Sequence, residues 1–414
     1  MNKEKIKVKI KTSIIMVFIT IVMLIVGIMI FFQYKSSNDF AMLTTQKIFD
    51  RVSDKVINQI QTYDSQSVGF VKLVQTIEYS DDLPKISQHH KLLPAITQYI
   101  KRQNYIYGIY IGFKNNSFYI VYNLDLSSKM RVAQKAPKEA IWLVKKNVPN
   151  SNGKFISYKN YLDKDFAIIS TSKEITSYLP TKRPWYKDAM NSSNIIKTKP
   201  YIFSSVQEQG VTYAQNIDGN NGTVLALDIT LSSLNKLLAS QELVEGSASF
   251  IFKEDGEIIG QSDNISNKKI ININKQYPSS FIKNGKVIDL EKQVVIVING
   301  KEYLKYTTKL KSDFKSKDYF TILSPIDIIM KPYKDKIFKT IAITFLTLIF
   351  LVMPILFYTV KLIVKPIMQL QKENKKIKEG KFEDVNPVNS FMLEISSLSN
   401  SLIIIKAKDL LRHA

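Results

Sequence analysis

Cysteine is absent from this 414-residue sequence, and histidine occurs only three times. Without cysteine the chain has no disulfide framework, no cysteine-ligated metal site and no cysteine nucleophile. The histidines, His89, His90 and His413, are too few for a histidine-rich metal centre or a histidine-based catalytic triad. We therefore expect neither a metal nor a cofactor.

Negative charge is also scarce, because 36 Asp and Glu residues stand against 58 Lys and Arg residues and the formal net charge is +22. The basic residues are spread along the chain. A basic surface attracts anionic ligands, but a genome biased toward Lys, Asn and Ile gives the same composition, and we favour that simpler explanation. The hydrophobic share of 45% is ordinary for a folded protein and excludes wholesale disorder.

Two long runs contain no charge. The first extends from Ile14 to Phe32 behind a lysine-rich arm, and its length matches the ~30 Å hydrocarbon core of a bilayer. A cleaved signal peptide has a shorter apolar core followed by small residues, whereas bulky Phe31, Phe32 and Tyr34 stand here. We therefore expect an uncleaved membrane helix.

The second run extends from Thr340 to Val360 and also has the length of a membrane span. Its Pro354 is tolerated in membrane helices. The alternative for either run is a buried core helix, but such helices rarely exceed ~14 uninterrupted apolar residues.

The positive-inside rule then orients the chain in a bacterial plasma or inner membrane. Residues 1–13 form a cytoplasmic basic arm, 14–32 and 340–360 cross the membrane, and 361–410 return to the cytoplasm. Residues 33–336 lie in the periplasm or outside the cell. Both termini are expected in the cytoplasm. Nucleic acid is not an expected partner, because most of the positive charge lies outside the cytoplasm.

The external segment is expected to be α+β, with two sheet modules on one long helix. Residues 34–78 lack proline and have apolar residues near helical spacing, and a break follows at Asp81–Pro84. Strand-like runs then fall into a distal module, about 80–240, and a proximal module, about 241–330. The expected strands are Tyr105–Phe113, Ser117–Asn123, Ala167–Ser170, Thr212–Asn216, Val224–Asp228, Ser247–Phe252, Ile258–Gln261, Val294–Ile298 and Tyr319–Pro325. A helix is expected over Thr230–Gln241.

One stretch of the distal module combines a cation with aromatic residues. Tyr178, Arg183, Trp185 and Tyr186 lie within nine residues, and Pro184 suits the first turn of a helix. A guanidinium matches a carboxylate, aromatic faces attract an ammonium group, and an aspartate such as Asp228 pairs with one. By itself the pattern also fits an arginine packed on tryptophan for structural reasons.

The order Tyr178, Arg183, Trp185, Tyr186, Tyr201 and Asp228, between two membrane helices, resembles the double Cache (dCache) sensor domain of bacterial receptors, whose modules are PAS-like. The resemblance covers the layout of the whole external segment and is sharpest at Arg-Pro-Trp-Tyr. In the amino-acid-sensing branch of that family, the matching arginine and tryptophan hold the ligand carboxylate. The tyrosines line the pocket, and the late aspartate takes the amino group. The resemblance thus implies a small-molecule ligand, an amino acid or another carboxylate.

One position departs from the family. A second aspartate often follows the tyrosine at 201 by two residues, and this chain has Phe203 there. The amine contact is therefore weakened, which also allows a ligand that is not an amino acid. Arg183 argues against the pure-amine branch of the family, which lacks this arginine.

After the second span, two helices with near-3.5 spacing of apolar residues are joined by a non-helical connector. The first seam is Ile363, Ile367, Leu370 and Ile377; the second is Ile395, Leu398, Leu402 and Ile405. Such a pair resembles the HAMP signal-transmission domain. The resemblance rests on Pro366, Gly380, Phe382 and Glu394, although Leu393 and Ser396 replace its usual aspartate and glycine. It implies a parallel homodimer, and the alternative is a generic amphipathic helix pair.

The residues after about 406 show no kinase, cyclase or phosphate-loop pattern. We therefore interpret this chain as non-enzymatic, with an output domain that is missing or supplied by a cytoplasmic partner. The expected function is a transmembrane receptor that binds a small ligand in the distal module and relays the signal through a HAMP dimer. The resemblance implies an output in chemotaxis, through a histidine kinase, or through cyclic-nucleotide signalling.

Two rival functions belong to other classes. One is a membrane-anchored extracellular hydrolase using paired carboxylates such as Asp125, Asp163 or Asp228. The other is a structural bitopic scaffold without a ligand. The sequence names neither the ligand nor the output.

Overall fold

The computed structural model describes residues 10–75, 90–103, 105–126, 128–217, 222–262, 270–312, 314 and 317–413. These divide into two compact units. The sheet unit spans Thr44–Ile329, and the helical unit combines Met1–Leu43 with Met330–Ala414. The 66-residue helix α1 (Ile10–Gln75) contributes to both. The expected break at Asp81–Pro84 lies outside the described residues.

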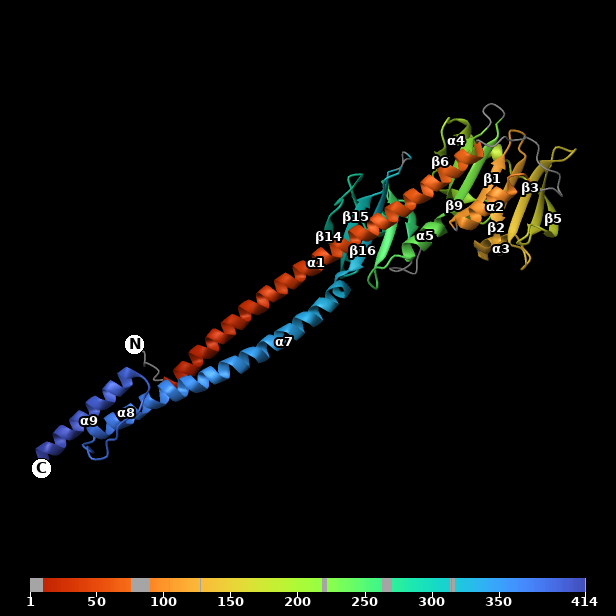
Figure 1. Cartoon of the computed structure of the whole chain (residues 1–414). Helices are drawn as coiled ribbons and strands as arrows, with labels where there is room; N and C mark the ends of the chain where they lie inside the picture. Colours follow the sequence, from red (N-terminus) through yellow and green to blue (C-terminus); the bar gives the residue numbers. More distant parts are fainter. Residues whose placement is uncertain are drawn as a thin grey trace. The chain divides into compact units, whose positions relative to one another are not determined.

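The distal module of the sheet unit is built on a nine-stranded antiparallel sheet (Figure 1). Eight strands follow the order β5-β4-β3-β2-β1-β9-β8-β6, and β7 pairs with β8. The strands are β1 (Ile106–Gly112), β2 (Phe118–Asn123), β3 (Trp142–Pro149), β4 (Phe155–Leu162), β5 (Ile168–Thr176), β6 (Ile196–Lys197), β7 (Tyr201–Phe203), β8 (Glu208–Asn216) and β9 (Val224–Thr230).

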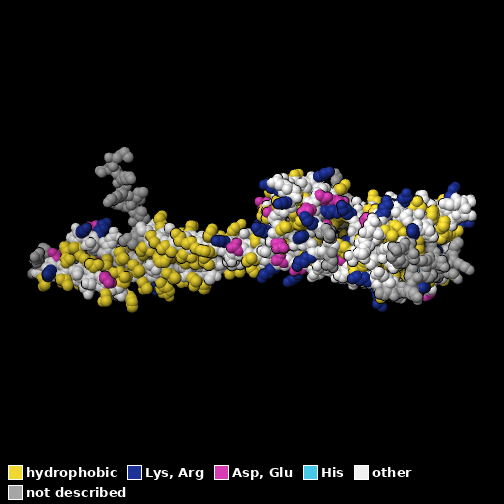
Figure 2. All heavy atoms as spheres, turned by 90° about the horizontal axis from the view of Figure 1, so that it is seen from above, with side chains coloured by type: hydrophobic (Ala, Val, Ile, Leu, Met, Phe, Trp, Pro, Cys, Tyr) yellow, Lys and Arg dark blue, Asp and Glu magenta, His cyan; other side chains and the backbone are white. Residues whose placement is uncertain are grey.

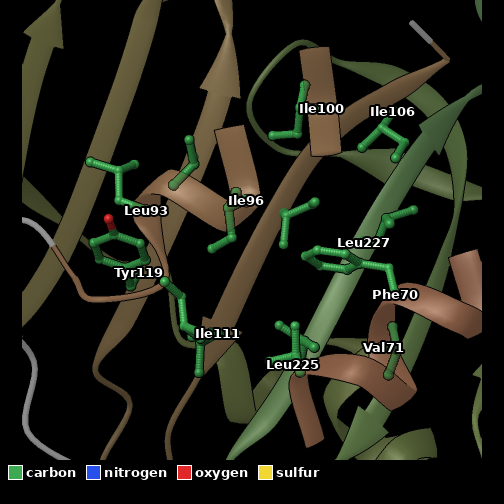
Figure 3. Packing of buried hydrophobic residues seen from close by; sticks show 14 of the residues in the cluster. Phe70, Val71, Leu93, Ile96, Ile100, Ile106, Ile111, Tyr119, Leu225 and Leu227 are labelled. Atoms are coloured by element: carbon green, nitrogen blue, oxygen red, sulfur yellow. The ribbon is translucent and has the colours of Figure 1, made fainter. Parts of the chain in front are cut away.

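One face of this sheet packs against the end of α1 and against α2 (Leu93–Arg102), which has its basic residues in the last turn. Figure 3 shows how Phe70 and Val71 of α1 and Ile96 of α2 meet Leu225 and Leu227 of β9. Because alternate strand residues point to opposite faces, the other face presents a second set of side chains. That face packs against α3 (Ser128–Ala133) and α4 (Pro184–Met190).

The proximal module has a five-stranded antiparallel sheet of order β11-β10-β16-β15-β14. Its strands are β10 (Ala248–Lys253), β11 (Ile258–Gln261), β14 (Gln293–Ile298), β15 (Lys301–Lys309) and β16 (Asp318–Pro325), with a small hairpin of β12 (Ile282–Lys283) and β13 (Lys286–Val287). Helix α5 (Leu231–Ala239) connects the modules, and α6 (Ile273–Gln276) follows. Phe49 of α1 packs against Tyr306 of β15, with ring centroids 6.1 Å apart.

The helical unit contains two helices long and apolar enough to cross a membrane, α1 and α7 (Ile326–Thr359). In the apolar windows of both helices no residue is buried inside the structure, and Figure 2 shows hydrophobic side chains gathered along these helices. A π-helix, η4 (Val360–Val364), then leads into α8 (Lys365–Lys378), and α9 (Leu393–His413) follows.

The expected α+β class, with one long helix and two antiparallel sheet modules, is confirmed. The β1–β2 hairpin turns at Lys114–Asn116, where Asn116 has a positive φ of 65°. Strands β3, β4 and β15 did not stand out in the sequence. Their lysines interrupt the apolar pattern, and Lys145 of β3 and Lys159 of β4 prove to line a cavity.

Candidate functional site

A cavity of about 600 Å³ opens on the α4 side of the distal sheet. Four of the six residues expected to bind ligand line it: Tyr178, Arg183, Tyr201 and Asp228. Its charged residues are Lys145, Lys159, Glu174, Lys182, Arg183 and Asp228. Cations outnumber carboxylates in this lining, so its electrostatic field favours an anionic ligand.

Arg183 stands at the start of α4. The chain makes a 3₁₀ turn, η2 (Pro180–Lys182), and Pro184 fixes the first helical φ, so Arg183 takes an extended conformation at the N-cap. Its guanidinium lies over two rings, 5.6 Å from the centroid of Tyr178 and 5.9 Å from that of Tyr201. One nitrogen donates to the carbonyl of Ile202 at 3.4 Å. Its remaining donors can serve a ligand.

Asp228 lies in β9 beneath this arginine and is buried. Its Oδ1 accepts hydrogen bonds from Tyr110 at 2.7 Å and from Thr212 at 2.5 Å. Burial raises the pKa of Asp228 to about 7, and the two donors and the positive charge of Arg183 oppose part of that rise. Near neutral pH the side chain is therefore divided between a carboxylic acid and a carboxylate.

A hydroxyl chain connects the aromatic wall to this aspartate. Tyr201 and Thr212 share a hydrogen bond of 2.7 Å, and since Thr212 gives its proton to Asp228, Tyr201 is the donor. Burial raises the pKa of Tyr201 and of Tyr110, so both stay protonated at neutral pH. No sequence pattern pointed to Tyr110 or Thr212, because only the strand register brings them to Asp228.

Trp185 and Tyr186 do not line the cavity. Trp185 is 1% exposed and packs edge-on against Tyr110, with ring centroids 4.9 Å apart. Its ring passes so close to Gly112 that a Cβ there would lie 2.5 Å from it, which explains the glycine. The hydroxyl of Tyr186 donates to the carbonyl of Gly222 at 2.5 Å. Both residues hold α4, and therefore Arg183, against the sheet.

The carboxylates of the hydrolase alternative do not come together. Asp125 pairs with Arg131 at 2.6 Å, and Asp163 accepts backbone hydrogen bonds within its own turn. Neither lines the cavity that contains Asp228. In the described part of the chain no group of three or more His, Cys, Asp or Glu residues could hold a metal ion.

The residues matched to a HAMP domain lie in the helical unit. Pro366 is buried at the start of α8, Gly380 has a φ of +72° just after it, Phe382 is half-buried and Glu394 is exposed. The connector between α8 and α9 is held by several hydrogen bonds. The side chain of Glu373 accepts a hydrogen bond from the backbone N–H of Asn386 at 2.9 Å, and the hydroxyl of Ser399 accepts one from the backbone N–H of Val388 at 2.7 Å. Lys406 donates to the carbonyls of Glu383 and Val385 at 2.8 Å each.

No protein-family model matches the chain. Over 398 residues the chain is 21% identical to Adenylate cyclase 1 of Rhizobium meliloti, a match that covers 94% of this chain and 60% of that protein. Over 103 residues it is 33% identical to the methyl-accepting chemotaxis protein PscA of Pseudomonas syringae pv. tomato, covering 24% of this chain and 16% of that protein.

Among solved structures, the ligand-binding domain of the Campylobacter jejuni chemoreceptor Tlp3 in complex with 4-methylisoleucine matches with a TM-score of 0.43 and 16% identity. That match covers 72% of this chain and 95% of the other. The resemblance to the sensor half of a signalling receptor is confirmed, because the sequence relatives are a chemotaxis protein and an adenylate cyclase.

Proposed function

We propose that this chain is the sensor half of a transmembrane receptor and that its distal module binds a small ligand bearing a carboxylate. The observation that carries the proposal is one cavity with Arg183 and Asp228 at the same end and aromatic rings between them. Arg183 presents a planar fork of donors to a carboxylate. Tyr178 and Tyr201 supply the apolar faces.

An α-amino acid and a plain carboxylate make different demands on Asp228. An ammonium group favours ionised Asp228, whereas a ligand without an amine is compatible with the protonated acid. Both hydrogen bonds to this side chain reach Oδ1, which leaves Oδ2 for the ligand. Since Phe203 adds no second carboxylate, the amine contact rests on Asp228 alone. The Tlp3 domain with bound 4-methylisoleucine supports an amino-acid ligand.

We propose that strand β8 transmits the occupancy of the cavity to α1. Thr212 donates to Asp228, which lines the cavity, while its neighbour Tyr213 points to the opposite face and donates to Asp64 of α1. Asp64 is buried and also accepts from Lys197 at 2.8 Å and from Ser312, in the proximal module, at 3.3 Å. A shift of β8 therefore changes contacts of the long helix directly. Ligand binding moves such an equilibrium only by its differential affinity for the two states.

On the cytoplasmic side we propose a HAMP-type homodimer formed by α8 and α9. Ile395 of the second seam is buried within one chain, whereas Leu398 and Ile405 are 59% and 45% exposed. A parallel partner helix would cover these two positions. The two termini then lie in the cytoplasm and the sheet unit outside. The cyclase and the chemotaxis protein extend beyond the matched regions, and we propose an output of one of these two kinds.

The proposal is tested with the full chain in lipid nanodiscs, by thermal unfolding followed through tryptophan fluorescence. The probes are L-amino acids, the same carboxylates without the amino group, and the matching amines. A bound probe at 100 times its Kd is expected to stabilise the protein by ~2.7 kcal/mol. We expect Arg183→Met to weaken every carboxylate at least tenfold, since hydrogen bonds to charged groups contribute ~1.5–3 kcal/mol.

Asp228→Asn is the second variant, and it should remove only the preference for the amino acid over its counterpart without an amine. Lys187→Met is the matched control, because Lys187 is exposed on α4, the helix that has Arg183 as its N-cap. Binding that survives both cavity substitutions would place the ligand elsewhere. A complete lack of stabilisation by carboxylates would favour the scaffold alternative.

A further inference from the structure

The far end of the cavity, on β3 and β4, carries charges that the contact with a single carboxylate does not use. Lys145 and Lys159 are directly paired across these antiparallel strands, and both line the cavity. On the same face of the sheet, Lys145 is paired with Ile120 of β2, and Ile120 with Tyr110 of β1. The hydroxyl of Tyr110 donates to Asp228. The lysines and the Arg183–Asp228 pair therefore face one continuous space.

Like charges placed directly opposite each other destabilise a sheet. Glu174 of β5 compensates the charge of Lys159, because its carboxylate lies 3.0 Å from the Lys159 ammonium group. Lys145 is different: within the described ranges its ammonium group makes no hydrogen bond and no ion pair. The side chain is half-buried. Burial and the charge of Lys159 lower its pKa, and the negative charge of Glu174 opposes part of that shift. A half-buried cation without a partner is costly unless something else pairs with it.

We propose that this end of the cavity is a second anion subsite, and that the ligand is a small dicarboxylate, with or without an α-amino group. Arg183 holds one carboxylate and Lys145, assisted by Lys159, holds the other. Two lysines and one glutamate leave a single positive charge at this end, which matches a carboxylate better than a doubly charged phosphate.

The spacing of the strands sets the kind of ligand. Asp228 lies on β9 and Lys145 on β3, and β2 and β1 separate them. Three strand spacings place the two backbones ~14 Å apart. Long side chains extend into the cavity from both ends, so the remaining gap suits a short linear molecule. This inference rests on the proposed function, because it assigns the second end of the same ligand.

The test compares ligands that differ only in the distant charge. L-Glutamate with L-glutamine, and glutarate with its monoamide, are titrated into the full chain in nanodiscs by isothermal titration calorimetry. In the unaltered protein we expect the dicarboxylate of at least one pair to bind about tenfold or more tightly than its amide, the effect of one charge-assisted contact. Lys145→Met should reduce that ratio to about one and leave the affinity for the amide within about twofold.

Lys173→Met is the matched control, since this exposed lysine lies on the adjacent strand β5 and pairs with Tyr158 on the opposite face of the sheet. It should leave the ratio unchanged. Equal affinities for acid and amide in the unaltered protein, or a preference that survives Lys145→Met, would overturn the second subsite while the Arg183 site stands. Failure of all four probes to bind in an Arg183-dependent manner would overturn both. Preference for phosphoserine over glutamate would overturn the assignment to a carboxylate.

Discussion

Two lysines, one in each module, show opposite ways of placing a cation inside the sheet unit. Lys305 of the proximal β15 is fully buried and satisfied from within the chain: its ammonium group donates to Asp289 at 2.8 Å and to the carbonyl of Ser280 at 2.7 Å, and lies 5.4 Å from the centre of the Phe281 ring. Lys145 of the distal β3 faces a cavity, and in the described part of the chain its ammonium group makes no hydrogen bond and no ion pair; only the more distant charge of Glu174 favours it.

This difference distinguishes a charged group that stabilises the fold from one that remains available to bind a ligand. A buried ion whose hydrogen bonds are completed by its own chain leaves no capacity for a ligand, and removing its partner is costly. A cation or acid in a cavity whose hydrogen bonds are not all completed by its own chain keeps its capacity for an incoming charge. Lys145 and Asp228 belong to this second class, and Lys305 with Asp289 belongs to the first.

The largest change in stability is expected when the pair of Lys305 and Asp289 is broken. Asp289→Asn keeps the shape of the side chain and tolerates the positive φ of 56° at this position, but it leaves Lys305 buried without its counter-charge. We expect a loss of ~3 kcal/mol in the free energy of unfolding, the lower end for a broken buried pair because Asp289 is partly exposed. Urea denaturation of the full chain in nanodiscs measures it. A loss below ~1 kcal/mol would mean that Lys305 is not held as the structure indicates.

The next effect concerns Asp228 and pH. Its pKa in the folded protein is raised to about 7 from an ordinary value of 3.8, so the folded state binds more protons between these values. The stability that this proton contributes is complete below the ordinary value and is lost as the pH rises toward 7. Asp228→Asn should flatten this dependence.

An ammonium-bearing ligand needs the ionised aspartate. Because only about a tenth of Asp228 is ionised at pH 6 against most of it at pH 8, an amino acid should bind about tenfold more weakly at pH 6. The same carboxylate without an amine should not weaken in this way. Calorimetric titration of the two probes at both pH values checks the prediction. Parallel pH profiles for the two ligands would show that Asp228 does not receive the amine.

The smallest effect is expected for the unpaired lysine itself. Lys145→Met removes a repulsion between cross-strand neighbours and, among the described residues, breaks no hydrogen bond and no ion pair, so the unliganded protein should gain ~0.2–1 kcal/mol in its free energy of unfolding. Urea denaturation without ligand measures this gain. A loss similar to that of Asp289→Asn would show that Lys145 has a structural partner, and the comparison between the modules would fail.

Much of the architecture was predictable because its causes are local. Uninterrupted apolar runs predicted the two helices that are long and apolar enough to cross a membrane, and alternation with turn residues predicted most strands of both modules. Pro184 predicted the start of α4 and, with it, the backbone position of Arg183. The resemblance to a dCache sensor then predicted that Tyr178, Arg183, Tyr201 and Asp228 belong to one site, and in the fold all four line one cavity.

The sequence by itself therefore determined the two long apolar helices, the α+β class and the arginine of the candidate site, since each depends on residues close together along the chain. Only the tertiary structure decided that Trp185 packs against Tyr110 beside the cavity without lining it, and that Lys145 of β3 lies opposite Lys159 of the neighbouring strand β4. Register and strand order set those contacts, and because side chains alternate between faces, a shift of one residue would have sent both lysines to the opposite side.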